Sequence, residues 1–225
     1  MGLEQAQTFL SDTGLAVLAG VWLAYFLIHS VLASLAVKRW VADRYPALMP
    51  AYRLLFNLLA VLLLIPPLYL AYSWQGPWLW RWTGIGWWLA NGLALSALAL
   101  FYWSLRYYDI SEFMGSRQWR ARERKVEDQE SFRISPLHRH VRHPWYALGL
   151  VLIWTRDMNP AFLLTAIVIT LYFMVGSRLE EKKLTAYHGD AYRRYLKRVP
   201  GLVPCPWRRL TPDEAEEFQR DARRS

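Results

Sequence analysis

The sequence is poor in cysteine, and no basic residue precedes its first long apolar run. A single cysteine, Cys205, excludes a disulfide framework and a cysteine-rich metal site. Residues 1–14 carry two acidic side chains and no lysine or arginine, so we expect no cleaved signal peptide, which begins with a basic region. Gly84-Ile85-Gly86 lacks the third glycine and the preceding strand of a nucleotide-binding turn, and we interpret it as a packing feature.

Apolar and aromatic residues are abundant instead. Hydrophobic residues make up 54% of the chain and aromatic residues 16%, with 13 tryptophans, which is too apolar for an ordinary soluble fold. The net charge of +9 could attract nucleic acid, but the basic residues fall between apolar runs. This arrangement is typical of a multi-pass membrane protein, whose partners are lipids rather than nucleic acid.

Five apolar segments predict an all-α polytopic membrane protein with five transmembrane segments, at about 15–37, 52–73, 84–105, 144–155 and 160–177. Pro66-Pro67 is expected to kink or end the second. The fourth has only 12 residues, about 18 Å as a helix, so we expect it to tilt or to extend backward. We expect the last two segments to form a helical hairpin, and the whole of 1–225 to form one membrane domain without internal repeats.

Lysine and arginine are distributed unevenly between the loops. Segments 38–53, 106–143 and 178–225 hold 4, 9 and 12 of the 27, and loops 74–83 and 156–159 hold one each. The positive-inside rule therefore places the three basic segments on the cytoplasmic side, with the N-terminus outside.

Two C-terminal helices are expected beyond the last span. The residues 191–199 show apolar side chains at helical spacing beside arginines and a lysine, which predicts an amphipathic helix lying along the membrane surface. Thr211-Pro212-Asp213-Glu214 is a capping box that opens a helix in the polar tail 205–225.

The stretch 136–146, P-L-H-R-H-V-R-H-P-W-Y, places three histidines and two arginines directly before an apolar run. A second polar cluster, Arg178-Leu179-Glu180-Glu181, follows the apolar stretch 160–177. Ionisable residues at a membrane segment indicate function, so we predict that the hairpin joins the two clusters into one site. Glu180 is the stronger candidate because it lies near the membrane boundary, whereas we interpret Glu181 as a surface partner of nearby lysines.

Two other interpretations of the first cluster were weighed. His138, His140 and His143 with the two glutamates could ligate a metal. Arg139 and Arg142 bring positive charge into the same residues, and membrane di-iron oxygenases use many more histidines than the five here, so we predict no metal. The stretch could also be a basic segment that touches lipid phosphate.

The two clusters together resemble the isoprenylcysteine carboxyl methyltransferase superfamily of integral-membrane S-adenosylmethionine (SAM) enzymes. The pattern is R-H-P-x-Y, then E-E-x-x-L-x-x-x-x-G-x-x-Y-x-x-Y, and it covers roughly residues 130–204. The N-terminal half resembles the bacterial branch with methanethiol S-methyltransferases and NnrU-like proteins. Its matching features are H-S-V-L-A-S at 29–34, Y-R-L-L-F-N at 52–57 and E-F-M-G-S-R-Q at 112–118.

The resemblance implies a SAM site formed by the cytoplasmic segments 130–146 and 178–204, and the bacterial branch implies a bacterial inner membrane. The residues that match SAM-binding positions of the family are Glu130, Ser131, Phe132, Arg133, His138, His143, Pro144, Trp145, Tyr146 and Glu180. Two positions depart from the family. His138 replaces a tyrosine, and the arginine that prenylcysteine enzymes use toward the substrate carboxylate falls on Gly176. The second departure favours a small substrate.

The residues agree with this chemistry. An anion (Glu180) suits the ammonium of SAM, donors (His143, Arg142 or Arg133) suit its carboxylate, and aromatic rings (Tyr146, Trp145) suit its sulfonium and adenine. A thiol with a pKa of about 8.5 is mostly protonated at pH 7, so a base or cation would help. We take His29 and Arg142 as the catalytic candidates. His29 could equally be a structural histidine satisfied by Ser30, Asn57 or a backbone carbonyl.

We therefore predict a SAM-dependent methyltransferase that S-methylates a small thiol such as methanethiol. One alternative acceptor is an isoprenylcysteine carboxylate or a lipid amine. Another alternative is a non-catalytic NnrU-like protein that binds haem through His29 and His143. The apolar spans have a generic composition, so the sequence does not name the acceptor or the oligomeric state.

Overall fold

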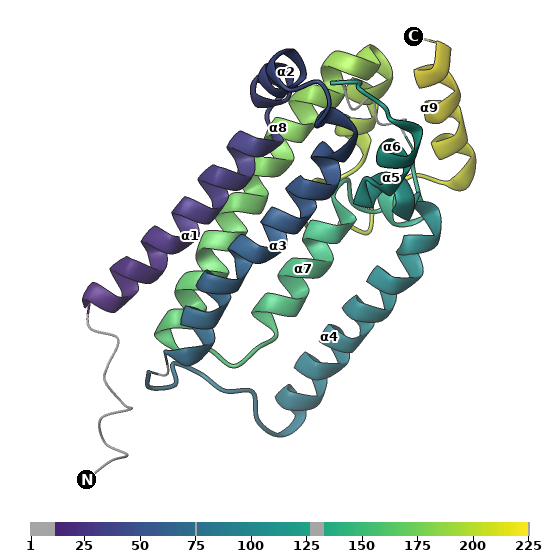
Figure 1. The fold of residues 1–225 in the computed structure, drawn as a ribbon. Coiled ribbons are helices and arrows are strands. Elements are labelled where there is room, and N and C mark those ends of the chain that lie inside the picture. The colour runs from purple at the N-terminus through teal and green to yellow at the C-terminus, as the bar shows by residue number, and fades with distance from the viewer. Residues whose placement is uncertain (1–11, 75, 127–132, 225) are drawn as a thin grey trace. The chain divides into compact units, whose positions relative to one another are not determined.

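The computed structural model describes residues 12–74, 76–126 and 133–224, and its described part is helical with no β-strand. The elements, shown in Figure 1, are α1 (Asp12–Ala33), α2 (Leu35–Arg44), α3 (Met49–Ser73), α4 (Gly84–Ser104), η2 (Leu105–Tyr107), α5 (Ile110–Met114), α6 (Ser116–Ala121), η3 (Leu137–Arg139), α7 (Pro144–Trp154), α8 (Pro160–Arg198) and α9 (Pro212–Arg224). The predicted all-α class is confirmed.

Four of these helices, α1, α3, α4 and α8, are long and apolar enough to cross a bilayer. This identifies an integral membrane protein with several spans. The remaining predicted segment, α7, is apolar but has only 11 residues, about 16 Å of helix. A count of five crossings therefore stays a prediction.

The first predicted span ends earlier than expected, while the second ends at Ser73 as predicted. The first span ends at Ala33 rather than at residue 37, because Ser34 caps a new helix and its Oγ accepts a hydrogen bond from Val37 N at 3.3 Å. The Pro66-Pro67 pair does not end the second segment, since α3 continues through it to Ser73.

The chain divides into two compact units, which are described separately. The first comprises the described residues of Met1–Trp82, Tyr108–Asp128 and Asp157–Val168, and the second comprises those of Thr83–Tyr107, Gln129–Arg156 and Ile169–Ser225. The single membrane domain over 1–225 stays a prediction.

In the first unit, buried polar contacts join the helices. Trp22 Nε1 of α1 donates to Thr165 Oγ1 at the start of α8, at 3.0 Å. Tyr52 Oη of α3 donates to Leu32 O of α1 at 2.6 Å. These bonds satisfy polar atoms that lipid could not satisfy, so they hold α1 on its neighbours.

The short helices α5 and α6 are held on α3. Arg53 Nη1 donates to Glu112 O at 2.9 Å, and Asn57 Nδ2 donates to Phe113 O at 3.0 Å. Gly115, with φ +89°, separates the two short helices and lies so close to α3 that a Cβ there would be 2.7 Å from Leu54 N. The glycine is therefore required by backbone conformation and by contact.

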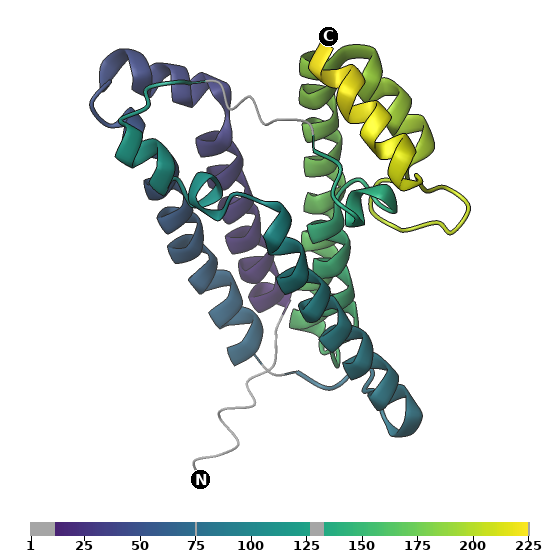
Figure 2. The ribbon, with the colours of Figure 1, turned by 90° about the vertical axis from the view of Figure 1, so that its right-hand side faces the viewer.

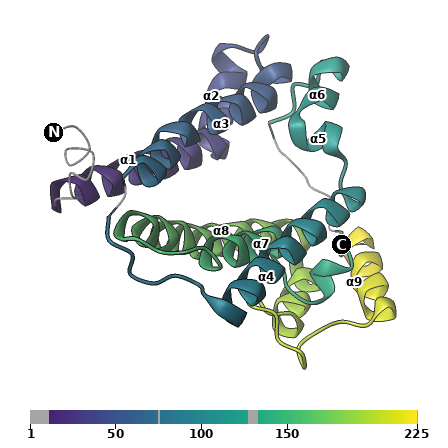
Figure 3. The same ribbon diagram turned by 90° about the horizontal axis from the view of Figure 1, so that it is seen from below.

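In the second unit, α7 packs between α4 and α8 (Figure 3). Trp145 Nε1, at the start of α7, donates to Ser104 Oγ at the end of α4, at 2.9 Å. Trp154 Nε1, at the end of α7, donates to Thr170 Oγ1 of α8 at 3.0 Å. Hydrogen bonds at both ends thus fix the register of α7 against its neighbours.

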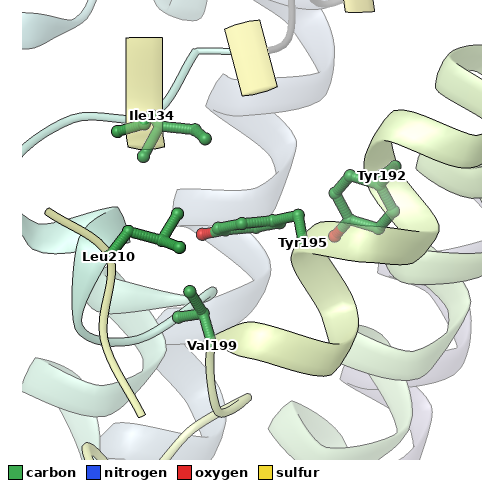
Figure 4. Close-up of a cluster of buried hydrophobic side chains, with 6 residues drawn as sticks. Ile134, Tyr192, Tyr195, Val199 and Leu210 are labelled. Atoms are coloured by element: carbon green, nitrogen blue, oxygen red, sulfur yellow. The ribbon is translucent and has the colours of Figure 1, made fainter. Parts of the chain in front are cut away.

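Helix α8 continues well past its apolar part and is interrupted at Gly189, whose φ is +51°. Beyond this break, Tyr192, Tyr195 and Val199 are buried in a cluster with Ile134 and Leu210 (Figure 4). The helix expected at 191–199 is present, but its predicted placement along the membrane surface is wrong, because its apolar face is covered by the chain itself.

The tail helix α9 provides part of that cover through Ala215 and Phe218. Its predicted capping box is confirmed. Thr211 N donates to Glu214 Oε2 at 2.8 Å, and Glu214 N donates to Thr211 Oγ1 at 3.3 Å. The capping box fixes the residue at which α9 begins. The start of the helix in turn sets which of its residues, here Ala215 and Phe218, face α8.

Candidate functional site

The histidine- and arginine-rich strip 138–143 is held along the C-terminal part of α8 and the segment that follows it. Tyr195 Oη donates to His138 O at 2.6 Å. Further on, Arg142 N donates to Pro200 O at 2.8 Å and His143 N donates to Gly201 O at 3.1 Å. The strip has little regular structure of its own, so these bonds orient its side chains.

Arg142 reaches across to α8. Its Nε and Nη2 lie 2.8 and 2.7 Å from Glu181 Oε1, while Nη1 donates to Leu196 O at 3.0 Å and to Val199 O. The two carbonyls lie at the C-terminal end of α8, Leu196 in its last turn and Val199 just beyond it, where carbonyls lack helical partners and carry negative partial charge. One guanidinium thus caps the helix and binds a carboxylate of the same helix. Its catalytic role stays a prediction.

His143 lies between two carboxylates. Its side chain is 5% exposed, with Nε2 3.0 Å from Glu181 Oε1 and Nδ1 3.3 Å from Glu180 Oε2. Burial alone lowers the pKa of His143, but the hydrogen bonds and charges of Glu180 and Glu181 outweigh it and raise the pKa to about 9. At neutral pH the ring is therefore an imidazolium, which donates from both nitrogens and does not act as a base.

The two glutamates differ in exposure and in partners. The Glu181 side chain is 16% exposed and pairs with both Arg142 and His143, whereas the Glu180 side chain is 42% exposed and, among the described residues, forms an ion pair only with His143. The interpretation of Glu181 as a lysine partner on a solvated face is wrong. Sequence reasoning missed this residue, although the E-E doublet itself was a signal that two faces of the helix carry a carboxylate at this level.

Two aromatic rings, Tyr146 and Phe173, form a column with the imidazolium of His143. Tyr146 stacks on His143 with centroids 5.5 Å apart and an interplanar angle of 11°, and on Phe173 at 4.6 Å and 8°. Gly149 allows the close approach of Phe173, since a Cβ there would lie 3.3 Å from Phe173 Cε2. Gly176 lies beside Tyr146, and a Cβ added at Gly176 would be 4.0 Å from the Tyr146 hydroxyl oxygen. Phe173 was not predicted as a site residue, because it lies inside an apolar run.

The remaining predicted cofactor residues are placed as follows. Trp145 faces α4, where its ring contacts Phe101 at 5.1 Å, and Pro144 occupies the first turn of α7. Arg133 is exposed. Glu130, Ser131 and Phe132 lie outside the described residues.

His138 is half-buried, and its Nδ1 lies 2.8 Å from Ser135 Oγ. Burial, helped by the positive charge of His143, lowers the pKa of His138 to about 4. The ring is therefore neutral at physiological pH, so it can present a flat uncharged surface. Its role toward a cofactor stays a prediction, as do those of the other residues.

The catalytic candidate His29 belongs to α1 in the first unit, whereas the residues above belong to the second. Its ring packs against Phe56 at 5.0 Å and Tyr25 at 5.9 Å. Its role in proton transfer stays a prediction.

Several curated proteins resemble this chain over most of its length. "Methanethiol S-methyltransferase 2" of Bradyrhizobium diazoefficiens is 33% identical over 211 residues, which cover 91% of this chain and 79% of that protein. "Methanethiol S-methyltransferase" of Crocosphaera subtropica is 31% identical over 209 residues, with 85% and 75% covered. "Nurim" of Xenopus laevis is 27% identical over 190 residues, with 79% and 65% covered. No family model and no solved structure matches the chain.

Proposed function

The chain belongs to the methanethiol S-methyltransferase family of membrane methyltransferases, and from this premise we propose that it transfers a methyl group from SAM to the sulfur of a small thiol, with methanethiol as the expected acceptor. The observation that supports the proposal is the pairing of His143 with Glu180, two residues that the family resemblance assigned to one cofactor site. The relatives' names do not favour a prenylcysteine or lipid-amine acceptor, or a haem-binding role.

The residues fit the charges of SAM, which supplies an electrophilic methyl group on a sulfonium. Glu180 is only half buried and uses Oε2 on His143, so its other oxygen can accept from an ammonium. The column of Tyr146 and Phe173 offers ring faces to a sulfonium. Arg142 directs its N–H groups to Glu181 and the α8 carbonyls, which leaves Arg133 as the expected donor to the carboxylate.

The protein's remaining tasks are to remove the thiol proton and to exclude water. The S–H proton must leave as the new S–C bond forms and the sulfonium C–S bond breaks, and His143 is already protonated at neutral pH. We therefore keep His29 as the proposed proton acceptor. An apolar site at the membrane boundary would favour the reaction, because a thiolate and a sulfonium lose their charges together.

We propose five crossings, with α7 and α8 as a hairpin. From Pro160 to Glu180, α8 is about 30 Å long, the thickness of the hydrocarbon core, so the site lies at one face of the membrane. The shorter α7 ends part-way across the hydrocarbon core. Just beyond its end, Arg156 Nη1 donates to Asn91 Oδ1 of α4 at 3.2 Å, so this polar side chain has a protein partner there.

The positive-inside rule supports a cytoplasmic site and an outer side that carries the two loops poor in basic residues. Those loops are joined, since Leu79 N donates to Met158 O at 2.8 Å and Met158 N donates to Trp80 O at 3.0 Å. We further propose that the protein lies in a bacterial inner membrane as one membrane domain.

The test is methyl transfer from labelled SAM by the purified full-length protein in nanodiscs, with methanethiol, larger thiols, a prenylcysteine analogue and phospholipids as acceptors. We expect a labelled thioether from methanethiol. Glu180→Gln should lose SAM affinity, while Glu217→Gln, an exposed glutamate of α9, should not. SAM binding without product from any thiol would contradict the proposed acceptor, and absent SAM binding would contradict the proposed cofactor.

His29→Ala tests the proposed base. If His29 accepts the proton, the variant should keep its SAM affinity and lose turnover, and raising the pH should partly restore the rate because more thiolate is present. Turnover equal to that of the unmodified protein would end the proposal.

A further inference from the structure

The segment 201–210, here called the rim loop, projects from the second unit between α8 and α9 (Figure 2). Both of its ends are pinned to the histidine- and arginine-rich strip. His143 N donates to Gly201 O at 3.1 Å, and Leu210 N donates to Arg139 O at 3.0 Å. Its position is therefore set by the strip rather than by a long flexible connection.

The strip lies beside the polar ends of three apolar helices, α4, α7 and α8. Trp145, two residues beyond His143, bonds to Ser104, the last residue of the candidate span α4. Glu180, beside His143, follows the apolar part of α8. Pro144 begins the apolar α7. The rim loop therefore leaves the protein at the level where hydrocarbon gives way to headgroups.

The rim loop turns large apolar side chains outward at this level. Val203 is 73% exposed and Trp207 is 83% exposed. The apolar face of α8 nearby is already covered by α9 and Ile134, so it does not shelter them. Tryptophan at a span's end is typical of membrane interfaces, where its apolar ring and its N–H are both accommodated.

Positive charge accompanies these side chains. Arg208 and Arg209 are exposed, and within the described residues neither forms an ion pair. Arg208 Nη2 donates to Lys197 O at 2.9 Å, which fixes its position without neutralising it. No acidic residue occurs from 200 to 212. Outward tryptophan and unneutralised arginines together match a phospholipid headgroup layer, apolar beneath and anionic above.

We propose that the rim loop is a membrane anchor: Val203 and Trp207 insert at the headgroup–hydrocarbon boundary, and Arg208 and Arg209 bind lipid phosphates. The anchor attaches directly to Gly201 and Leu210, hence to the strip that carries His143. Lipid contact thus holds the strip at the membrane surface, where an apolar thiol dissolved in the bilayer would reach it. The anchor itself does not depend on the proposed reaction.

Site-directed spin labelling of the full-length protein tests this proposal. Because the chain has a single cysteine, one substitution removes every competing labelling site. In a Cys205→Ser background, one cysteine is introduced by Val203→Cys, Trp207→Cys or, as a control on the exposed face of α9, Glu216→Cys. Each labelled protein is placed in nanodiscs of phosphatidylcholine and phosphatidylglycerol. Collisions with oxygen, which concentrates in lipid, are compared with collisions with a water-soluble nickel chelate.

We expect a several-fold higher oxygen-to-nickel ratio at 203 and 207 than at 216. Ratios at 203 and 207 equal to that at 216 would overturn the anchor. In the Trp207→Cys protein, adding Arg208→Gln and Arg209→Gln should make the label shallower, and an unchanged depth would overturn the role of the arginines. Thermal unfolding of every variant checks that it is folded, so a loss of depth is not mistaken for a loss of structure.

Discussion

Glu181 and Arg142 form a nearly buried ion pair that joins residues 39 positions apart in the chain. The guanidinium places two nitrogens within 2.8 Å of one carboxylate oxygen, and the two side chains are 13% and 16% exposed. Pairs of this kind contribute little net stability when intact, but removing one partner leaves a buried charge without a counter-ion. The pair thus makes the site depend on the correct docking of the strip onto α8.

Glu181→Gln should destabilise the protein by about 3 kcal/mol, because Arg142 and the His143 imidazolium both lose a charged partner. Glu180→Gln should change stability by less than about 1 kcal/mol, since its side chain is half exposed. The same variant should weaken SAM binding by about 10- to 100-fold, the value of a hydrogen bond to a charged group. Thermal unfolding and calorimetric titration in nanodiscs separate the two effects. Equal stability of the two variants would contradict this division of roles.

The charge of His143 predicts a pH dependence. The pKa of His143 is raised to about 9 in the folded protein, above the ordinary 6.5, so the folded state binds the proton more tightly. Its contribution to stability is fully present below pH 6.5 and is lost as the pH rises through about 9. Titration of ¹³C-labelled histidine by NMR should show one ring that changes charge near pH 9. In Glu181→Gln this transition should move to lower pH, and a transition of the His143 ring at or below pH 6.5 in the unmodified protein would contradict the geometry.

Gly149→Ala tests the aromatic column. The added Cβ would lie 3.3 Å from Phe173 Cε2, so the Phe173 ring must shift by a few tenths of an ångström and tilt against Tyr146. We expect SAM affinity to fall a few-fold with little loss of stability, because alanine is the better helix residue by up to about 1 kcal/mol. Gly20→Ala is the matched control, since nothing lies within 4 Å of its added Cβ. Unchanged SAM affinity in Gly149→Ala would exclude the column from the site.

Gly115→Ala should weaken the docking of α5 and α6 on α3. The added Cβ would lie 2.7 Å from Leu54 N and 2.8 Å from Arg53 Cβ, at a backbone φ of +89°. We expect a loss of about 1–3 kcal/mol from strain and overlap, visible as a lower midpoint of thermal unfolding. Gly92→Ala, in open space on α4, should be neutral or slightly stabilising. If both variants unfolded at the same temperature, the close approach at Gly115 would be refuted.

The helical class, the four long spans and the two polar clusters were predictable from the sequence, because each depends on local composition. An apolar run long enough to cross a bilayer reveals itself without any partner. The capping box of Thr211 and Glu214 was predictable for the same reason, since its donors and acceptors are three residues apart.

Only the tertiary structure decided which residues of the clusters face one another. Glu180 and Glu181 are neighbours in sequence, yet successive residues point about 100° apart on a helix, and the docking of the strip onto α8 determines which of them pairs with Arg142. The apolar face of residues 191–199 could equally have met lipid or protein, and α9 decided it. Periodicity shows that a face must be covered, whereas its partner is set by contacts between distant residues, which no local pattern contains.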